Sequence, residues 1–240
     1  MYRYLKNLYR RQSFFPGFLG LFTNPFYFAR MGLYKAIKDF SSDLSGRLLD
    51  IGCGSKPYAE LFFVDEYVGL EIDNIETRKK GIANYYYDGN SFPFEVEQFD
   101  AVLCNQVFEH VFNPDFFMSE ISRVLRPSGK LLLSVPFTWD EHEQPYDFAR
   151  YSSFALKFIL EQHGFRVIGQ IKTCADTTTI FQLINAYLYK IFIHRSRTMQ
   201  FLLTITVIAF FNIMGVLIGK ALPKNDDLYL DNVVLAVKIS

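Results

Sequence analysis

The sequence predicts an α/β fold in which a parallel sheet is covered by helices on both faces. Between residues 47 and 171, short apolar runs alternate with stretches of helical periodicity. The runs are almost continuously hydrophobic, as strands buried on both faces are, and glycines and prolines separate them from the helices. A length of 240 residues suffices for one large domain or two small ones.

Seven apolar runs are expected to form strands. In chain order they are 47–51 (RLLDI), 67–72 (YVGLEI), 83–87 (ANYYY), 99–104 (FDAVLC), 130–136 (KLLLSVP), 165–171 (FRVIGQI) and 232–238 (NVVLAVK). The last of them follows a proline and a polar, acidic turn, which separate it from the preceding apolar segment.

Two helices between these strands have clear start and stop signals. The first begins at Asn113, a good N-cap residue, continues with Pro114 in its first turn, and ends before Gly129. Its apolar residues recur at helical spacing and form one face. Residues 151–165 predict a second helix, which Gly164 terminates.

Charge is distributed unevenly along the chain. Overall, 25 basic residues balance 25 acidic ones, but residues 1–38 contain seven Lys or Arg and no acid. A basic leader that also carries many aromatic residues favours an anionic partner, and we expect a membrane surface. A solvated basic arm is the alternative. Nucleic acid is not expected, because the rest of the chain has a net charge of −7.

Cysteine usage and the N-terminal pattern indicate a cytoplasmic protein. The protein could also bind peripherally to the cytoplasmic membrane. The three cysteines are scattered and form no CxxC motif, which fits a reducing compartment. The apolar stretch near the N-terminus is interrupted by Pro16, Gly17, Gly20 and Pro25 and does not resemble a secretory signal.

The loop after the first strand is the first candidate for a ligand site. Asp50 stands at the end of the strand, and Gly52 and Gly54 follow it, where glycines let the backbone turn sharply and approach a ligand. Glu71 ends the second strand and could accept both ribose hydroxyls of a nucleoside. The dinucleotide fingerprint would require a third glycine where Pro57 stands, so a nicotinamide cofactor is disfavoured.

Four stretches in order, LLDIGCGSKPY, YVGLEID, FDAVLCNQVFEHV and ISRVLRPSGKLLLSVPF, resemble the class I S-adenosylmethionine-dependent methyltransferases, in particular the type 11 group. The resemblance covers about residues 45–170 and, through the final strand, the C-terminal end. It implies a Rossmann-like seven-stranded sheet in the order 3-2-1-4-5-7-6, with strand 7 antiparallel, and S-adenosylmethionine as cofactor.

The same resemblance assigns the first glycine loop to the methionine part of the cofactor. Asp50, Gly52 and Gly54 would cradle it, and Cys53 lies in the same loop, where it reads as a small packing residue. Many relatives have GxGxG, whereas Lys56 stands at the third position here. This departure puts the detailed geometry of the loop in doubt more than the identity of the cofactor.

Residues after the next strands complete the cofactor site that the resemblance implies. Glu71 would take the ribose hydroxyls, with Asp73 as the alternative. Asp88 would lie beside the adenine amino group, or else cap a turn. Asn105 and Gln106, after the fourth strand, would line the cofactor.

Two histidines are candidate catalytic bases, because an imidazole can accept a proton near neutral pH. His110 follows the fourth strand and His142 follows the fifth. A base is required if the methyl acceptor is a hydroxyl. For His110, an orienting role towards Glu109 or its loop is the alternative.

The stretch around His142 is expected to bind the acceptor. Its candidate residues are Glu143, Tyr146, Asp147, Arg150 and Tyr151. Capping and salt bridging within the loop is the alternative. A metal site could be built from such residues, but none is expected, because methyl transfer can proceed without one.

The resemblance implies a methyltransferase that acts on a glycan, a lipid-linked sugar or a small metabolite. The two histidines favour a hydroxyl as the acceptor, and the apolar leader and insertion favour one at or near a membrane. The alternative is an inactive cofactor-binding or membrane-associated assembly module. A dehydrogenase is a distant third.

The apolar run 201–218 (FLLTITVIAFFNIMGVLI) is as long as a bilayer-spanning helix needs. A single crossing would place the sixth and seventh strands on opposite sides of the membrane, so we expect a helical hairpin with residues 177–193. The expected organisation is a leader, 1–46, with a helix in its second half, and a methyltransferase domain, 47–240, with an apolar insertion, 175–222. The hairpin could meet the membrane interface, form a homodimer or cover the acceptor pocket.

Overall fold

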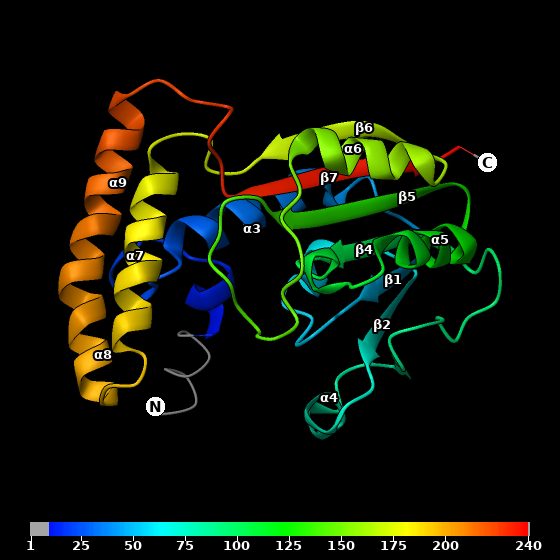
Figure 1. Ribbon diagram of the computed structural model, residues 1–240, viewed down its shortest axis with the longest axis horizontal. Coiled ribbons are helices and arrows are strands. Elements are labelled where there is room, and N and C mark those ends of the chain that lie inside the picture. The colour runs from blue at the N-terminus through cyan, green and yellow to red at the C-terminus, as the bar shows by residue number, and fades with distance from the viewer. Residues whose placement is uncertain (1–9, 240) are drawn as a thin grey trace. The chain divides into compact units, whose positions relative to one another are not determined.

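The computed structural model describes residues 10–239 and contains a seven-stranded sheet in the order β3-β2-β1-β4-β5-β7-β6 (Figure 1). Arg3 and Lys6 of the basic leader lie outside the described residues. The strands are β1 Arg47–Ile51, β2 Glu66–Ile72, β3 Tyr85–Tyr87, β4 Phe99–Asn105, β5 Leu125–Pro136, β6 Phe165–Lys172 and β7 Asp231–Lys238. The predicted strands and their order are confirmed.

The sheet is mixed, because its last strand in sequence runs against its neighbours. β1 pairs in parallel with β2 and β4, and the pairs β2–β3 and β4–β5 are parallel too. At one end of β7, the backbone N–H of Thr173 donates to Asp231; at the other end, that of Ile239 donates to Gly164. β7 is therefore antiparallel to β6, as Figure 1 shows, in agreement with the expected topology.

Strand β5 begins five residues before the expected start at residue 130. Phe99 of β4 pairs with Leu125 and Ala101 pairs with Lys130, so the register shifts between these two pairs. Residues 126–129 bulge out of the ladder, and Ser128 adopts a left-handed φ of 63° there. The apolar pattern predicted the regular part of the strand but not the bulge before it.

The helices beside the sheet begin where the sequence signals indicated. In α5, Pro114–Val124, the side chain of Asn113 accepts a hydrogen bond from Phe116 N, which caps the first turn. α6, Ser153–Gln162, is capped in the same way by Ser152. The buried face of α5 contributes Phe117, Met118, Ile121 and Val124 to the core between helix and sheet.

The chain divides into two compact units. The first contains the chain as far as Lys35, with Thr138–Asp140 and Lys172–Asp231. The second contains Ala36–Phe137, Glu141–Ile171 and the residues from Asn232 onward, and includes nearly the whole sheet. The remaining short helices are η1 Ala59–Leu61, α4 Ile75–Lys80 and η2 Phe108–His110.

The first unit is helical and contains the predicted hairpin. Its helices are α2 Gly20–Thr23, α3 Tyr27–Ser41 (which continues into the second unit), α7 Thr178–Phe192, α8 Arg197–Leu203, the π-helical segment η3 Thr204–Ile208 and α9 Ala209–Ala221. The last three form one continuous helix, which lies antiparallel to α7 (Figure 1). Its most apolar window has a mean hydropathy of 2.5 and is 28% buried, so by length and composition it could cross a membrane.

Buried amide side chains join the hairpin to the leader. Gln182 of α7 accepts hydrogen bonds from the backbone N–H groups of Phe28 and Ala29, in the first turn of α3. Asn185 of α7 donates to the side chain of Asn212 in α9 at 2.9 Å. Because all three amides are fully buried, these bonds fix how the helices of this unit pack.

Candidate active site

The two glycines after β1 serve different purposes. Both have left-handed backbones, with φ of 65° at Gly52 and 50° at Gly54. A Cβ on Gly52 would lie 2.3 Å from Val107 Cγ2, whereas a Cβ on Gly54 would meet nothing closer than a carbonyl oxygen at 4.0 Å. Packing therefore requires Gly52, and Gly54 leaves the backbone of the loop open to a ligand.

Asp50 is a buried carboxyl group beneath this loop. It is 4% exposed and accepts a hydrogen bond of 2.7 Å from the Tyr67 hydroxyl. Burial raises the pKa of Asp50 to about 7, against the opposing effects of the Tyr67 hydrogen bond and the nearby Lys56 charge. A cationic ligand at the loop would stabilise the ionised form of this carboxyl.

Lys56, which stands where many relatives have a third glycine, is tied down inside the site. Its Nζ donates to Asn84 Oδ1 at 2.7 Å, and that oxygen also accepts from the backbone N–H of Gly69. A Cβ on Gly69 would lie 2.5 Å from Lys56 Cε, so the glycine makes room for the lysine stem. Lys56, which replaces the third glycine of the family pattern, is thus held by contacts with Asn84 and Gly69.

Glu71 is placed to receive a diol at the end of β2. One carboxylate oxygen accepts from Gly54 N at 2.9 Å and the other from Ile72 N at 3.1 Å, which leaves further acceptor positions on both. Asp73, the alternative, is engaged by the Arg78 guanidinium at 2.7 Å through both oxygens. The geometry therefore favours Glu71.

The remaining cofactor candidates follow β3 and β4. Asp88 accepts hydrogen bonds from the backbone and side chain of Asn90, which lower the pKa of its exposed carboxyl. Asn105 accepts from the Ser134 hydroxyl at 2.7 Å, and Gln106 donates its backbone N–H to Ser134. Asp88 therefore caps a turn in this structure. Because it directly follows β3, it also lies at the carboxyl edge of the sheet, where the cofactor is expected.

These groups fit S-adenosylmethionine. The open backbone at Gly54, the diol acceptor Glu71 and the titratable Asp50 all lie at the carboxyl ends of neighbouring parallel strands. Burial raises the pKa of Cys53 to about 12, and the side chain is only 2% exposed. Cys53 is accordingly a packing residue without the thiolate character of a nucleophile.

A cluster of two histidines and a glutamate forms beyond this cofactor loop. His110 Nδ1 lies 2.8 Å from the carbonyl oxygen of Tyr146, and His142 Nδ1 lies 3.2 Å from Asp147 Oδ2. Because these oxygens can only accept, each Nδ1 acts as the donor in its contact. Both Nε2 atoms face Oε1 of the buried Glu109, at 3.7 and 4.0 Å.

The same three residues could hold a divalent ion. One ligand atom from each of Glu109, His110 and His142 lies within 4.8 Å of the others. Imidazole and carboxylate ligands suit several divalent metals, and the Nδ1 partners resemble the outer contacts of metal-ligating histidines. Glu109 was not predicted as a site residue; its position directly before His110 was the available signal.

Asp147 organises the loop that carries His142. Its carboxylate accepts two hydrogen bonds from Arg150, at 2.5 and 2.7 Å, and one from the backbone N–H of His142 at 2.9 Å. The Arg150 hydrogen bond holds the pKa of Asp147 at about 2. Asp147 and Arg150 therefore form a salt bridge within the loop, which was the alternative to acceptor binding for these two residues. Through Asp147, this pair also holds the His142 ring.

The other acceptor candidates are divided between packing and solvent. Tyr151 stacks on Phe108 with ring centroids 5.0 Å apart. The Tyr146 side chain is 65% exposed, and Glu143 is exposed with a left-handed φ of 48°. Of this set, Glu143 and Tyr146 are the side chains most accessible to an acceptor.

A family model described as a methyltransferase domain matches residues 26–170 of the chain.

An uncharacterized protein of Methanocaldococcus jannaschii is 29% identical over 151 residues, which are 58% of this chain and 71% of that protein. The ubiquinone biosynthesis O-methyltransferase of Caulobacter sp. (strain K31) is 32% identical, over 42% of this chain and 47% of that enzyme. The fatty-acid O-methyltransferase of Mycolicibacterium smegmatis is 35% identical, over 38% of each chain. The matched region thus spans less than half of either O-methyltransferase.

Solved structures share the fold at low sequence identity. The phosphoethanolamine N-methyltransferase 2 of Haemonchus contortus has a TM-score of 0.56 at 19% identity, covering 98% of this chain and 57% of that one. The [4+2]-cyclase SpnF has a TM-score of 0.54 at 19% identity, covering 86% and 79%. A cyclase and a methyltransferase on one fold show that the reaction must be argued from the site.

Proposed function

The chain belongs to the class I methyltransferase family and uses S-adenosylmethionine, and we propose that it methylates a hydroxyl oxygen of a glycan, a lipid-linked sugar or a small metabolite at or near a membrane. The observation that carries this proposal is the His142–Asp147 contact of 3.2 Å. The two O-methyltransferases among the relatives support an oxygen acceptor.

The cofactor supplies an activated methyl group, and the protein supplies alignment and proton removal. A hydroxyl must lose its proton as it attacks. His142 Nε2 presents a lone pair for that proton, while Asp147 holds the ring and stabilises the imidazolium that forms. His110, whose ring is fixed by the Tyr146 carbonyl oxygen, is the second candidate base.

The test has two steps. Calorimetry measures binding of S-adenosylmethionine by the full chain, and labelled methyl transfer then locates the product in a cell extract separated into lipid-linked, polysaccharide and soluble fractions. Label in one fraction names the acceptor class. Tight cofactor binding with no transfer to any fraction would instead favour the inactive cofactor-binding module.

Charge and exposed apolar surface support peripheral membrane contact. The helical unit contains twelve Lys and Arg residues against five Asp, a net charge of +7, whereas the unit with the sheet has −7. Large apolar side chains are exposed along the hairpin; they include Tyr187, Ile191, Phe201, Leu202, Phe210 and Leu217. A basic surface with exposed apolar side chains favours binding to anionic lipid.

Vesicle flotation tests this contact. We expect the protein to float with phosphatidylglycerol vesicles, and the double substitution Phe210→Ser and Leu217→Ser to abolish flotation. Phe154→Ser is the matched control, because Phe154 is 83% exposed on α6 in the other unit. A wild-type protein that stays with the soluble fraction would contradict the membrane contact. A dimer that dissociates in the double variant would assign the apolar surface to a homodimer through residues 175–222.

A further inference from the structure

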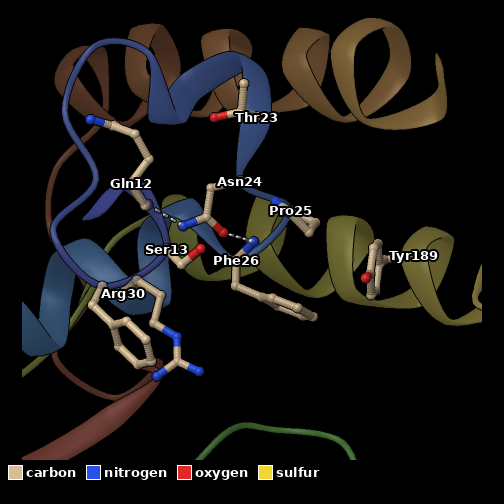
Figure 2. A pocket seen from close by; sticks show the side chains of 9 residues that line it. Gln12, Ser13, Thr23, Asn24, Pro25, Phe26, Arg30 and Tyr189 are labelled. Atoms are coloured by element: carbon tan, nitrogen blue, oxygen red, sulfur yellow. Dashed lines mark hydrogen bonds between the residues drawn. The ribbon is translucent and has the colours of Figure 1, made fainter. Parts of the chain in front are cut away.

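A cavity in the helical unit lies among residues of the leader and α7, and the methyl-transfer residues play no part in it (Figure 2). Its volume is about 110 Å³, several times what one water molecule requires. Arg30 lines it together with aromatic residues, including Phe26 and Tyr189, and with the polar residues Ser13 and Asn24. No carboxylate lines it among the described residues.

The wall of the cavity is held in place by hydrogen bonds. Asn24, which is 6% exposed, donates to the backbone oxygen of Gln12 at 2.9 Å and accepts from the N–H of Phe26 at 2.8 Å (Figure 2). The side chain of Asn212 in α9 donates to the backbone oxygen of Asn24 at 3.2 Å. The cavity is therefore part of the packed structure of this unit.

Arg30 brings a partly buried positive charge to this cavity. Its guanidinium lies over the ring of Phe14, 5.1 Å from the centroid. Its N–H donors lie in the plane of the group, and within residues 10–239 they make no hydrogen bond. In the described part of the chain no carboxylate lies within ion-pairing distance of Arg30, and the sequence has no acidic residue before Asp39.

Arg30 is a partly buried residue, and an anion that accompanies its charge would stabilise it there. Its fork of donors matches the oxygens of a phosphate in a bidentate arrangement. The Phe26 and Tyr189 rings, with centroids 5.2 Å apart, add an apolar wall for whatever the phosphate is attached to. We propose that this cavity binds a phosphate group, with Arg30 as its principal ligand.

Two sources could supply this phosphate: the headgroup of an anionic lipid or a soluble phosphate ester. The first arm of the test measures binding of inorganic phosphate to the full chain by calorimetry at constant ionic strength. The second arm measures flotation with phosphatidylcholine vesicles, with and without phosphatidic acid. Binding in the first arm identifies a site open to soluble phosphate. Binding in the second arm alone identifies a lipid headgroup if it also depends on Arg30, because the exposed apolar hairpin can attract anionic vesicles by itself.

Variants then assign the binding to Arg30. We expect Arg30→Gln to weaken binding at least tenfold, and Arg30→Lys to weaken it several-fold, because lysine keeps the charge but loses the fork. Arg197→Gln, which removes the same charge from an exposed site of the same unit, should leave binding unchanged. Melting temperatures verify folding; if Arg30→Gln unfolds, Arg30→Lys decides.

Three results would overturn the proposal: no binding in either arm, equal binding by the wild type and the folded Arg30 variants, or an equal loss in Arg197→Gln. The last result would indicate attraction by the net charge of the unit. Each is distinguishable from a failure of the methyl-transfer proposal, because none of these measurements uses S-adenosylmethionine.

Discussion

The imidazole rings of His110 and His142 meet edge to face, with centroids 4.9 Å apart and planes at 79°. They come from the loops after two neighbouring strands, β4 and β5, and their Nε2 atoms face the same Glu109 oxygen. Each ring is oriented through Nδ1 by a different acceptor. The pair therefore presents two imidazoles at the carboxyl edge of the sheet.

Asp147→Asn should lower kcat by about 10²-fold while the affinity for S-adenosylmethionine stays unchanged. The amide can present its NH2 group to His142 Nδ1, which would favour the tautomer without a lone pair on Nε2. The measurement is steady-state kinetics with cofactor titration. Asp115→Asn is the control, because Asp115 is 84% exposed and faces a different histidine, His163. An unaltered kcat in Asp147→Asn would limit Asp147 to holding its loop.

Gly52→Ala and Gly54→Ala should fail in different ways. The first should lower the free energy of unfolding by about 3 kcal/mol, because the new Cβ would overlap Val107. The second should cost only about 1 kcal/mol from its left-handed φ, but weaken cofactor binding more than tenfold by covering the open backbone. Denaturant unfolding and calorimetry separate the two effects. Equal cofactor affinity in Gly54→Ala and the wild type would remove this loop from the cofactor site.

The stability of the cofactor-free protein should depend on pH through Asp50. Burial raises the pKa of this carboxyl from 3.8 to about 7, so between these values the native state keeps a proton that the unfolded chain has released. The contribution of Asp50 to stability is complete below pH 4 and is lost as pH rises through about 7, by up to about 1.4 kcal/mol per pH unit.

Asp50→Asn removes this titration. Relative to that of the wild type, its free energy of unfolding should become steadily larger as pH rises from 4 to 7, as measured by urea unfolding at several pH values. Parallel pH curves for the two proteins would show that Asp50 is ionised in the native state throughout this range.

Gln182→Leu should lower the free energy of unfolding by about 3 kcal/mol. It removes the acceptor for Phe28 N and Ala29 N and the donor to the Pro25 carbonyl oxygen, all in a buried position. Thermal unfolding followed by circular dichroism measures the effect. Gln200→Leu provides the control, because its two hydrogen bonds to backbone oxygens lie at an exposed turn. A melting temperature equal to that of the wild type would show that α3 does not depend on this contact.

The sequence predicted the strands, their order and the capped helices because these follow from local patterns and from a family resemblance. It did not predict Tyr67 as the partner of Asp50, because that contact depends on register. Leu48 pairs with Tyr67 and Asp50 with Gly69, which places the tyrosine hydroxyl beside the carboxyl group. No spacing in the sequence contains that information.

The contacts of Lys56 with Asn84 and Gly69 could not be predicted from the sequence either. The lysine looked like a departure from a glycine pattern, whereas the structure shows that it occupies the space above Gly69 and reaches Asn84. Similarly, the apolar pattern predicted the hairpin helices but not the buried amides that join them to the leader. Such contacts link residues far apart in the chain, so only the folded structure brings them together.

The most direct test compares labelled methyl transfer to the acceptor fraction by the wild type and His142→Gln, each at a saturating S-adenosylmethionine concentration established by calorimetry. A wild-type assay with EDTA should proceed at the full rate; a loss of activity on chelation would assign Glu109, His110 and His142 to a metal ion. We expect His142→Gln to bind the cofactor as the wild type does but to transfer methyl groups about 10²-fold or more slowly. Transfer at the wild-type rate by His142→Gln would contradict a role of His142 as the base.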